Sequence, residues 1–118
     1  MKLALIFIAL ALLQVVSSQV VGGWQPIDWT GDDQELNDLL DWGVQEAVWE
    51  AVEAGELESG EWAVSEVNSA SQQIVAGINY EWDVDIDNGQ GQTQNLDLVV
   101  FDQSWTDTQD LVSWSLNN

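Results

Sequence analysis

The reactive side chains of this chain are almost all carboxylates. Among its 118 residues there are 21 Asp and Glu, no Cys and no His, and the single basic side chain is Lys2. Without Cys or His there is no Cys–His or Ser–His nucleophilic pair, and the usual nitrogen and sulfur ligands of zinc are missing. Two kinds of chemistry are left: catalysis by paired carboxylates and binding of hard cations through oxygen.

The scarcity of cationic side chains excludes further classes of site and partner. Nucleic-acid surfaces and phosphate clamps depend on Lys and Arg, and neither occurs after Lys2. Paired-carboxylate catalysis is disfavoured as well, because the acids are scattered and no pair is marked out by an apolar setting. The sequence therefore indicates a protein that is not an enzyme, needs no cofactor and binds no nucleic acid.

One acidic segment, residues 83–89, invites a calcium interpretation. An EF-hand loop starting at Asp83 would need Gly at its sixth position and Glu at its twelfth, but Asn88 and Gln94 stand there. A strand with a solvated acidic face that runs into an Asn-Gly turn is the simpler interpretation. The sequence predicts no specific metal site. Diffuse binding of calcium or of a mineral surface stays open.

The first residues are typical of a secretion signal. Lys2 gives a short positive start, residues 3–13 form a nearly unbroken apolar run, and residues 16–18 are small, as a signal peptidase prefers. A membrane anchor is the alternative, but a bilayer span needs roughly 20 apolar residues. We therefore expect a signal peptide at 1–18, secretion to the extracellular space, and a mature domain at 19–118 with no membrane contact after cleavage.

The mature chain begins its regular structure with a helix. Asp32 or Asp33 is a suitable N-cap, Glu35 lies in the first turn, and Gly55 suits a left-handed stop. Apolar residues between these points recur at three- and four-residue steps and form one stripe: Leu36, Leu39, Leu40, Val44, Ala47, Val48, Ala51 and Val52. This periodicity predicts a helix of about five turns with one buried face.

The rest of the chain is typical of strands and turns. Residues 72–86 alternate strictly, with Ile74, Ala76, Ile78, Tyr80, Trp82, Val84 and Ile86 on one face. Residues 62–67, 96–101 and 111–116 predict three more strands, and residues 88–91 predict a turn. One helix followed by an antiparallel meander is an α+β pattern, in which the helix packs on a four- to five-stranded sheet.

Three segments of the mature chain resemble the contact segments of the cystatin family. Residues 73–77, Gln-Ile-Val-Ala-Gly, resemble the family's Gln-x-Val-x-Gly first hairpin. Residues 21–23, Val-Gly-Gly, resemble its N-terminal glycine segment. Residues 101–105, Phe-Asp-Gln-Ser-Trp, resemble its second hairpin, usually Phe-Asp-Gln-Pro-Trp. The segments occur in the family's order, and the resemblance covers essentially all of residues 19–118.

The resemblance implies a reversible, non-covalent inhibitor that plugs the active-site cleft of papain-like, cathepsin L-like cysteine proteases. An N-terminal arm and two hairpins would form the wedge, and we expect the protein to be a monomer. The implied protease-binding residues are Val20, Val21, Gly22, Gly23, Gln73, Ile74, Val75, Ala76, Gly77, Ser104 and Trp105. The two valines of the arm would fill substrate pockets, the glycines would turn the arm away from the catalytic thiol, and Trp105 would anchor the interface.

The chain departs from the family's pattern in two respects. Ser104 replaces the usual proline, so we expect a looser second hairpin, because proline would fix φ. The disulfides of typical secreted members are impossible without cysteine. The main alternative is therefore a cystatin-fold protein that no longer inhibits and instead binds calcium, mineral or another partner through its acidic surface. Trp24, Trp29 and Trp49 fit neither the predicted core nor the predicted wedge.

Overall fold

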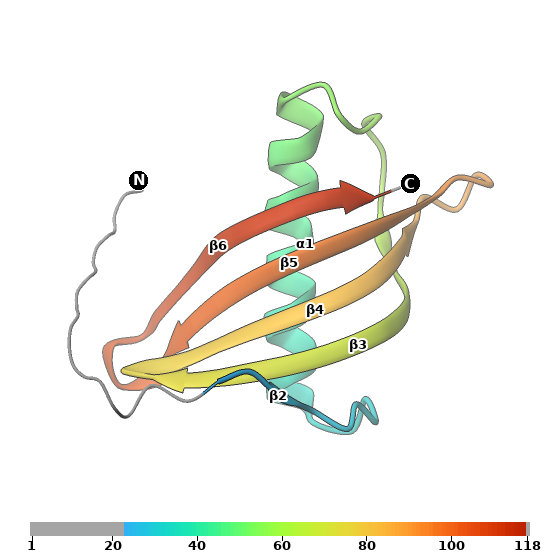
Figure 1. Cartoon of the computed structure of the whole chain (residues 1–118). Coiled ribbons are helices and arrows are strands. Elements are labelled where there is room, and N and C mark those ends of the chain that lie inside the picture. The colour runs from blue at the N-terminus through green and yellow to red at the C-terminus, as the bar shows by residue number, and fades with distance from the viewer. Residues whose placement is uncertain (1–22, 118) are drawn as a thin grey trace.

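The structure is a computed structural model that describes residues 23–117. The predicted signal peptide and the predicted contact residues Val20, Val21 and Gly22 lie outside the described residues. Within 23–117, one helix crosses one face of a five-stranded antiparallel sheet (Figure 1), which confirms the predicted α+β class. No helix in this range has both the length and the apolar composition that a bilayer span requires.

Helix α1 runs from Gln34 to Glu53. Asp33 is its N-cap, and the Asp33 carboxylate accepts a hydrogen bond from the Leu36 backbone N–H at 3.2 Å. Past the C-terminus, Gly55 has φ 76°, the left-handed conformation predicted for it. Most of the predicted apolar stripe is buried, namely Leu39, Leu40, Val44, Ala47, Val48 and Ala51. The stripe faces the sheet and forms half of the core.

The strands follow one another across the sheet in sequence order. They are β2 (Gln25–Pro26), β3 (Ala63–Val75), β4 (Gly77–Asp87), β5 (Thr93–Gln103) and β6 (Thr108–Asn117). Each strand pairs antiparallel with the next, so β4 and β5 lie at the centre and β6 forms one edge. In this meander every second connection returns to the same end of the sheet.

The predicted alternation over residues 72–86 spans two strands rather than one. β3 ends at Val75 and β4 starts at Gly77, so a turn falls at Ala76. Beyond the turn the alternation is correct, and the buried face of β4 comprises Tyr80, Trp82, Val84 and Ile86. Ile74, by contrast, is 57% exposed. A connection of one residue leaves the spacing of apolar residues unchanged, so alternation alone does not reveal it.

The core lies between α1 and the two central strands. Trp82 of β4, Val100 of β5 and Val44 of the helix are fully buried. Gly43 permits this contact, because a Cβ atom there would lie 2.7 Å from Val100 Cγ2. A glycine in a helix costs about 1 kcal/mol relative to alanine, and here that cost allows the helix to approach the sheet closely. With no disulfide available, this core carries the stability of the domain.

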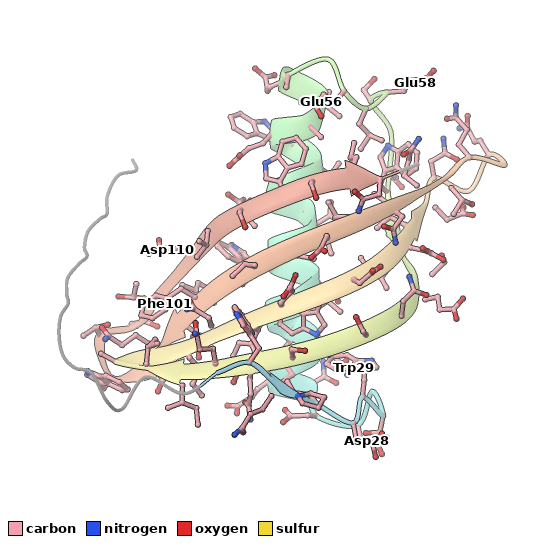
Figure 2. All side chains as sticks on the ribbon, viewed as in Figure 1. Asp28, Trp29, Glu56, Glu58, Phe101 and Asp110 are labelled. Carbon is pink, nitrogen blue, oxygen red and sulfur yellow. The ribbon has the colours of Figure 1, made fainter. Side chains whose placement is uncertain are left out.

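Trp29, which the sequence left unexplained, belongs to an aromatic cluster packed against the core. Its ring meets the Trp82 ring edge-on, with centroids 6.1 Å apart and an interplanar angle of 86°. The Tyr80 ring also stacks on the Trp82 ring, with centroids 5.4 Å apart and an interplanar angle of 18°. Both geometries are favourable for aromatic pairs. Figure 2 shows Trp29 beside β3, where it covers this side of the core. Nothing in the structure explains Trp49, which is 65% exposed.

Candidate functional site

Both hairpin turns and the start of β2 lie at the same end of the sheet (Figure 1). The strand register brings the two turns together, because Ile78 at the start of β4 pairs with Asp102 at the end of β5. β2 joins them by pairing with the end of β3. We call this end the hairpin edge and define it as residues 23–24, 73–77 and 103–107. It contains every predicted contact residue within the described range.

The first hairpin has a turn of a single residue. Val75 pairs with Gly77, and Ala76 alone forms the turn. Gly77 has φ 122°, which L side chains rarely adopt. A Cβ atom there would also lie 2.7 Å from the Phe101 ring, which Figure 2 labels near the hairpin end of β5. The position therefore requires glycine for two independent reasons. Behind the turn, the Asn79 side-chain amide donates to Gln73 Oε1 at 3.2 Å.

The second hairpin is built on a short 3-10 helix, η2, which spans Ser104–Thr106. Asp107 closes it with φ 56° and ψ 42°, and the Asp107 backbone N–H donates to the Ser104 carbonyl at 3.1 Å. Aspartate is one of the few residues that tolerate this left-handed conformation. Trp105 occupies the apex of the turn and is 70% exposed. The predicted anchor residue therefore extends from the hairpin edge into solvent.

The N-terminal arm is described from Gly23 onward. Gly23 is exposed, and within residues 25–117 no atom lies within 4 Å of the place a Cβ atom would take. Two residues later the chain becomes anchored, because Gln25 pairs with Gln72 and the Ile27 N–H donates to the Ala70 carbonyl at 2.8 Å. This pairing carries the arm along β3 toward the first hairpin.

Large apolar side chains gather at the hairpin edge. Trp24 is 43% exposed, Ile74 57% and Trp105 70%, and each comes from a different one of its three segments. Tryptophan on a rigid turn is the residue type that most often anchors protein interfaces, because it offers a large area with few rotatable bonds. Trp24 was missed as a contact residue in the sequence. Its one signal there is its position directly after the glycine pair.

Gln103 was also missed, because its partner is 27 residues away in the sequence. Its side-chain amide donates to the carbonyl of Ala76 at 2.7 Å, so the two hairpins are directly bonded to each other. The residue lies within the resemblance segment 101–105, but no local pattern distinguishes it from its neighbours. Only the strand register brings it opposite the tip of the first hairpin.

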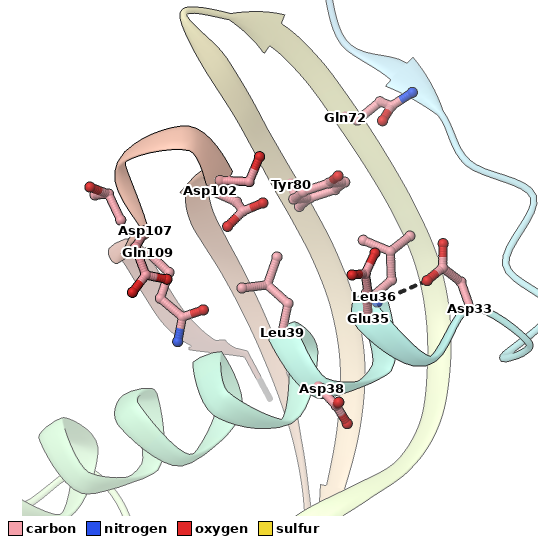
Figure 3. A pocket seen from close by; sticks show the side chains of 12 residues that line it. Asp33, Glu35, Leu36, Asp38, Leu39, Gln72, Tyr80, Asp102, Asp107 and Gln109 are labelled. Carbon is pink, nitrogen blue, oxygen red and sulfur yellow. Dashed lines mark hydrogen bonds between the residues drawn. The ribbon is translucent and has the colours of Figure 1, made fainter.

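A cavity of about 630 Å³ lies beside the second hairpin, between it and the start of α1 (Figure 3). Its lining includes Asp33, Glu35, Asp102 and Asp107 around the phenol of Tyr80. Burial raises the pKa of Tyr80 above 10.0, and the charges of Asp102, Asp33 and Glu35 raise it further in that order. Among the described residues no basic side chain lines this cavity, so its field repels anions.

The acidic segment of β4 is occupied with hydrogen bonds of its own. Asn68 donates to Asp83 and Asp85 at 3.1 and 3.0 Å, and Asn95 donates to Asp83 at 2.6 Å. Asp87 accepts the Gly89 N–H at 2.6 Å and so shapes the turn. These contacts fit the strand-and-turn interpretation. Within residues 23–117 no group of three acidic side chains is arranged to hold a metal ion.

Solved structures with the same fold include two from animals. A salivary cystatin of the soft tick Ornithodoros moubata superposes with a TM-score of 0.60 at 18% identity, and the match covers 82% of this chain and 98% of that one. Dimeric human cystatin F superposes with a TM-score of 0.61 at 15% identity, covering 84% and 90% of the two chains. At such low identities the likeness concerns the fold alone.

Sequence relatives include two proteins of rice, Oryza sativa subsp. japonica. Cysteine proteinase inhibitor 8 is 35% identical over 95 residues, which cover 80% of this chain and 71% of the relative. Cysteine proteinase inhibitor 6 is 31% identical over 97 residues, which cover 81% and 80%. The family model of the cystatin domain matches residues 31–112, which include the helix, both hairpins and most of the sheet. The chain therefore belongs to the cystatin family.

Proposed function

We propose that this chain is a reversible, non-covalent inhibitor of papain-like cysteine proteases, including cathepsin L-like ones. Family membership and the rice cysteine proteinase inhibitors support inhibition of cysteine proteases in general. The observation that carries the finer proposal is the hairpin edge. Three segments from distant parts of the sequence meet there, and each presents one exposed large apolar side chain, Trp24, Ile74 or Trp105.

Such an edge inhibits by shape and needs no reactive group. The single-residue turn at Ala76 is narrow enough to enter a cleft, and Trp105 covers the surface beside it. The turns of the two hairpins are short, and a hydrogen bond joins them, so little conformational entropy is lost when they dock. Gly22 and Gly23 let the arm bend away before any peptide bond reaches the catalytic thiol. The valines before them would enter the substrate pockets.

The environment of the protein belongs to the same proposal. We propose that residues 1–18 are removed as a signal peptide and that the protein acts outside the cell as a monomer. The remaining chain would carry 21 acids and no basic side chain. Its field slows the approach of acidic proteases and favours those with a basic rim around the cleft, and added salt weakens both effects.

Titration of papain with residues 19–118 at about pH 5.5 tests the proposal. We expect inhibition that reverses on dilution. The Trp105→Ala substitution should weaken it by roughly 30-fold, since truncation of an interface anchor costs about 2 kcal/mol. Gly22→Trp should weaken it by blocking the bend of the arm. Both variants should keep the melting temperature of the parent; for Trp105→Ala the reason is that Trp105 is not part of the core.

Trp49→Ala is the matched control. Trp49 is as exposed as Trp105, at 65% against 70%, but it lies on α1 and outside the hairpin edge. Its removal should leave the inhibition constant unchanged. If the parent protein fails to inhibit papain and cathepsin L at micromolar concentration, the proposal is wrong, and the alternative of an acidic binding protein takes its place.

A further inference from the structure

A chain of side-chain hydrogen bonds runs from β6 through the second hairpin to the tip of the first. The hydroxyls of Thr106 and Thr108 are 2.8 Å apart. The Thr106 hydroxyl donates to Gln103 Oε1 at 2.7 Å, and Gln103 Nε2 donates to the Ala76 carbonyl at 2.7 Å. Since Thr106 has one hydroxyl proton and gives it to Gln103, Thr108 is the donor to Thr106. Every bond then points the same way, an arrangement in which each bond strengthens the next.

The second hairpin gains from this support because Ser104 does not restrict its own backbone angle as proline would. Ser104 is the first residue of η2, a position where proline would fix φ and lose no helical hydrogen bond. Serine leaves that backbone angle free. One backbone hydrogen bond closes the turn, and in it the Asp107 N–H donates to the Ser104 carbonyl. Its orientation relative to the first hairpin therefore depends on contacts outside the turn.

Gln103 supplies that contact, and its two amide atoms have separate tasks. The oxygen holds Thr106 within the second hairpin, and the nitrogen holds Ala76 at the tip of the first. Gln103 and Thr108 are also paired across β5 and β6, so the bonded group sits at the last rung of the sheet. Trp105 lies between Gln103 and Thr106 in the sequence, so the hydrogen bond between their side chains spans it and limits its movement.

We propose that Gln103 is a positioning residue that locks the two hairpins into one rigid edge and thereby stands in for the missing proline. It acts through Ala76 and Trp105, which it holds in place for the protease. This inference rests on the proposed inhibitory function. Its consequence is that the free protein already has the docking geometry, so binding does not have to order the second hairpin.

The test compares Gln103→Ala in two backgrounds, the parent chain and Ser104→Pro. In the parent we expect Gln103→Ala to raise the inhibition constant for papain by about tenfold, mainly through faster dissociation, as is usual for interface variants. In the Ser104→Pro background the same substitution should raise it by less than about threefold. Gln103, which would precede the proline, is extended, with φ −133° and ψ 93°, and so lies outside the α region that a following proline disfavours.

Two further variants separate the roles of the amide. Gln103→Glu keeps an oxygen for Thr106 but replaces the donor to Ala76, so it should weaken inhibition as much as Gln103→Ala does. Gln109→Glu adds the same charge on exposed β6 and should leave inhibition unchanged. Melting temperatures of all variants should agree within about 2 °C, because the bonds lie on the surface.

Two outcomes would overturn the inference. One is an unchanged inhibition constant for Gln103→Ala. The other is an equal loss in both backgrounds, which would mean that Gln103 touches the protease directly. If the parent chain does not inhibit at all, hydrogen exchange still decides. The Asp107 amide proton should exchange at least about fivefold faster in Gln103→Ala, and Ser104→Pro should restore its protection; the absence of this change refutes the lock whatever the function.

Discussion

Tyr80 combines two environments in one side chain. Its ring stacks on Trp82 in the core, while its phenol lies among the carboxylates of the cavity beside the second hairpin. Both environments oppose ionisation. Burial removes the phenolate from water, and Asp102 is the first of the charges that repel it. The protein has no other tyrosine, so the titration of this one group can be followed without overlap.

We expect the pKa of Tyr80 to lie above 10.0 in the folded protein. Ultraviolet absorbance of the phenolate measures this directly. Asp102→Asn should lower the pKa of Tyr80, whereas Asp110→Asn on exposed β6 should leave it in place. A group with a raised folded pKa stabilises the fold fully below its unfolded pKa and loses that contribution as pH rises through the folded value. Alkaline unfolding that coincides with phenolate formation would agree; a pKa of 10 or lower would contradict it.

At the residue scale, the sequence identified those residues of the hairpin edge whose features depend on neighbouring residues in the chain. Gly77 belongs to a five-residue segment, and its positive φ is a property of its own backbone. Gln103 and Trp24 could not be recognised in the same way. The contact of Gln103 with Ala76 depends on the register of β4 on β5, and the exposure of Trp24 depends on where β2 pairs. Neither is encoded in neighbouring residues.

The central strands β4 and β5 carry acids that face each other on the side of the sheet away from α1. Asp83 and Asp97 are directly paired in the register, and Glu81 lies diagonally across from Asp97. The pKa of Glu81 is raised above 4.5, first by burial, then by its hydrogen bond with Asp97, and then by the charges of Asp97 and Asp83. Like charges opposite one another weaken a sheet.

Replacing Glu81 with Gln should therefore stabilise the protein at neutral pH. The amide keeps a hydrogen-bond donor for Asp97 and removes one of the repelling charges. Because the folded pKa of Glu81 is raised, its favourable contribution is complete below about pH 4.5 and is lost as pH rises through the folded value. We expect a higher melting temperature for Glu81→Gln at pH 7 and no difference near pH 4, measured by calorimetry.

Asp110→Asn is the control for that comparison. Asp110 is exposed on β6 and pairs with Phe101 rather than with an acid, and its replacement removes the same charge from the same sheet. It should raise the melting temperature at pH 7 by clearly less than Glu81→Gln does. Equal effects of the two variants would show that only the total charge counts and that the pairing of β4 with β5 contributes nothing.

At the scale of elements, local signals were sufficient for the helix but not for the first hairpin. The cap at Asp33 and the stop at Gly55 define α1 within the sequence itself. The strict alternation over residues 72–86 predicted a continuous strand, because a turn of one residue preserves period two. The resemblance of residues 73–77 to a hairpin predicted the break, and the structure confirms the hairpin.

The whole molecule carries a formal charge of −20 with no basic side chain after Lys2. The carboxylates of the domain repel one another, and within residues 23–117 no basic side chain is present to form an ion pair that would offset this repulsion. Salt at 0.1 M shortens the range of this repulsion to about 10 Å. The folded state benefits more than the unfolded chain, because its carboxylates are held closer together.

Melting temperature should therefore rise with sodium chloride from about 10 to 300 mM at pH 7. The same series at about pH 4, where many carboxylates are protonated, serves as the control and should show a smaller rise. Chloride is a suitable anion, since sulfate would also strengthen hydrophobic burial. A melting temperature that is independent of salt at pH 7 would mean that the repulsion between carboxylates does not affect the free energy of unfolding.

The tryptophans of this protein differ widely in their access to water. Trp82 is enclosed by Trp29 and Tyr80 and has no exposed surface, while Trp105 is 70% exposed at the apex of the second hairpin. A soluble quencher such as acrylamide or iodide can reach the second indole and not the first. The fluorescence of the native protein thus contains a shielded component that reports on the core and an accessible one, to which Trp24 and Trp105 of the hairpin edge contribute together with Trp49 on α1. A bound protease would convert part of the accessible emission into shielded emission, so docking and unfolding would change the two components in opposite directions.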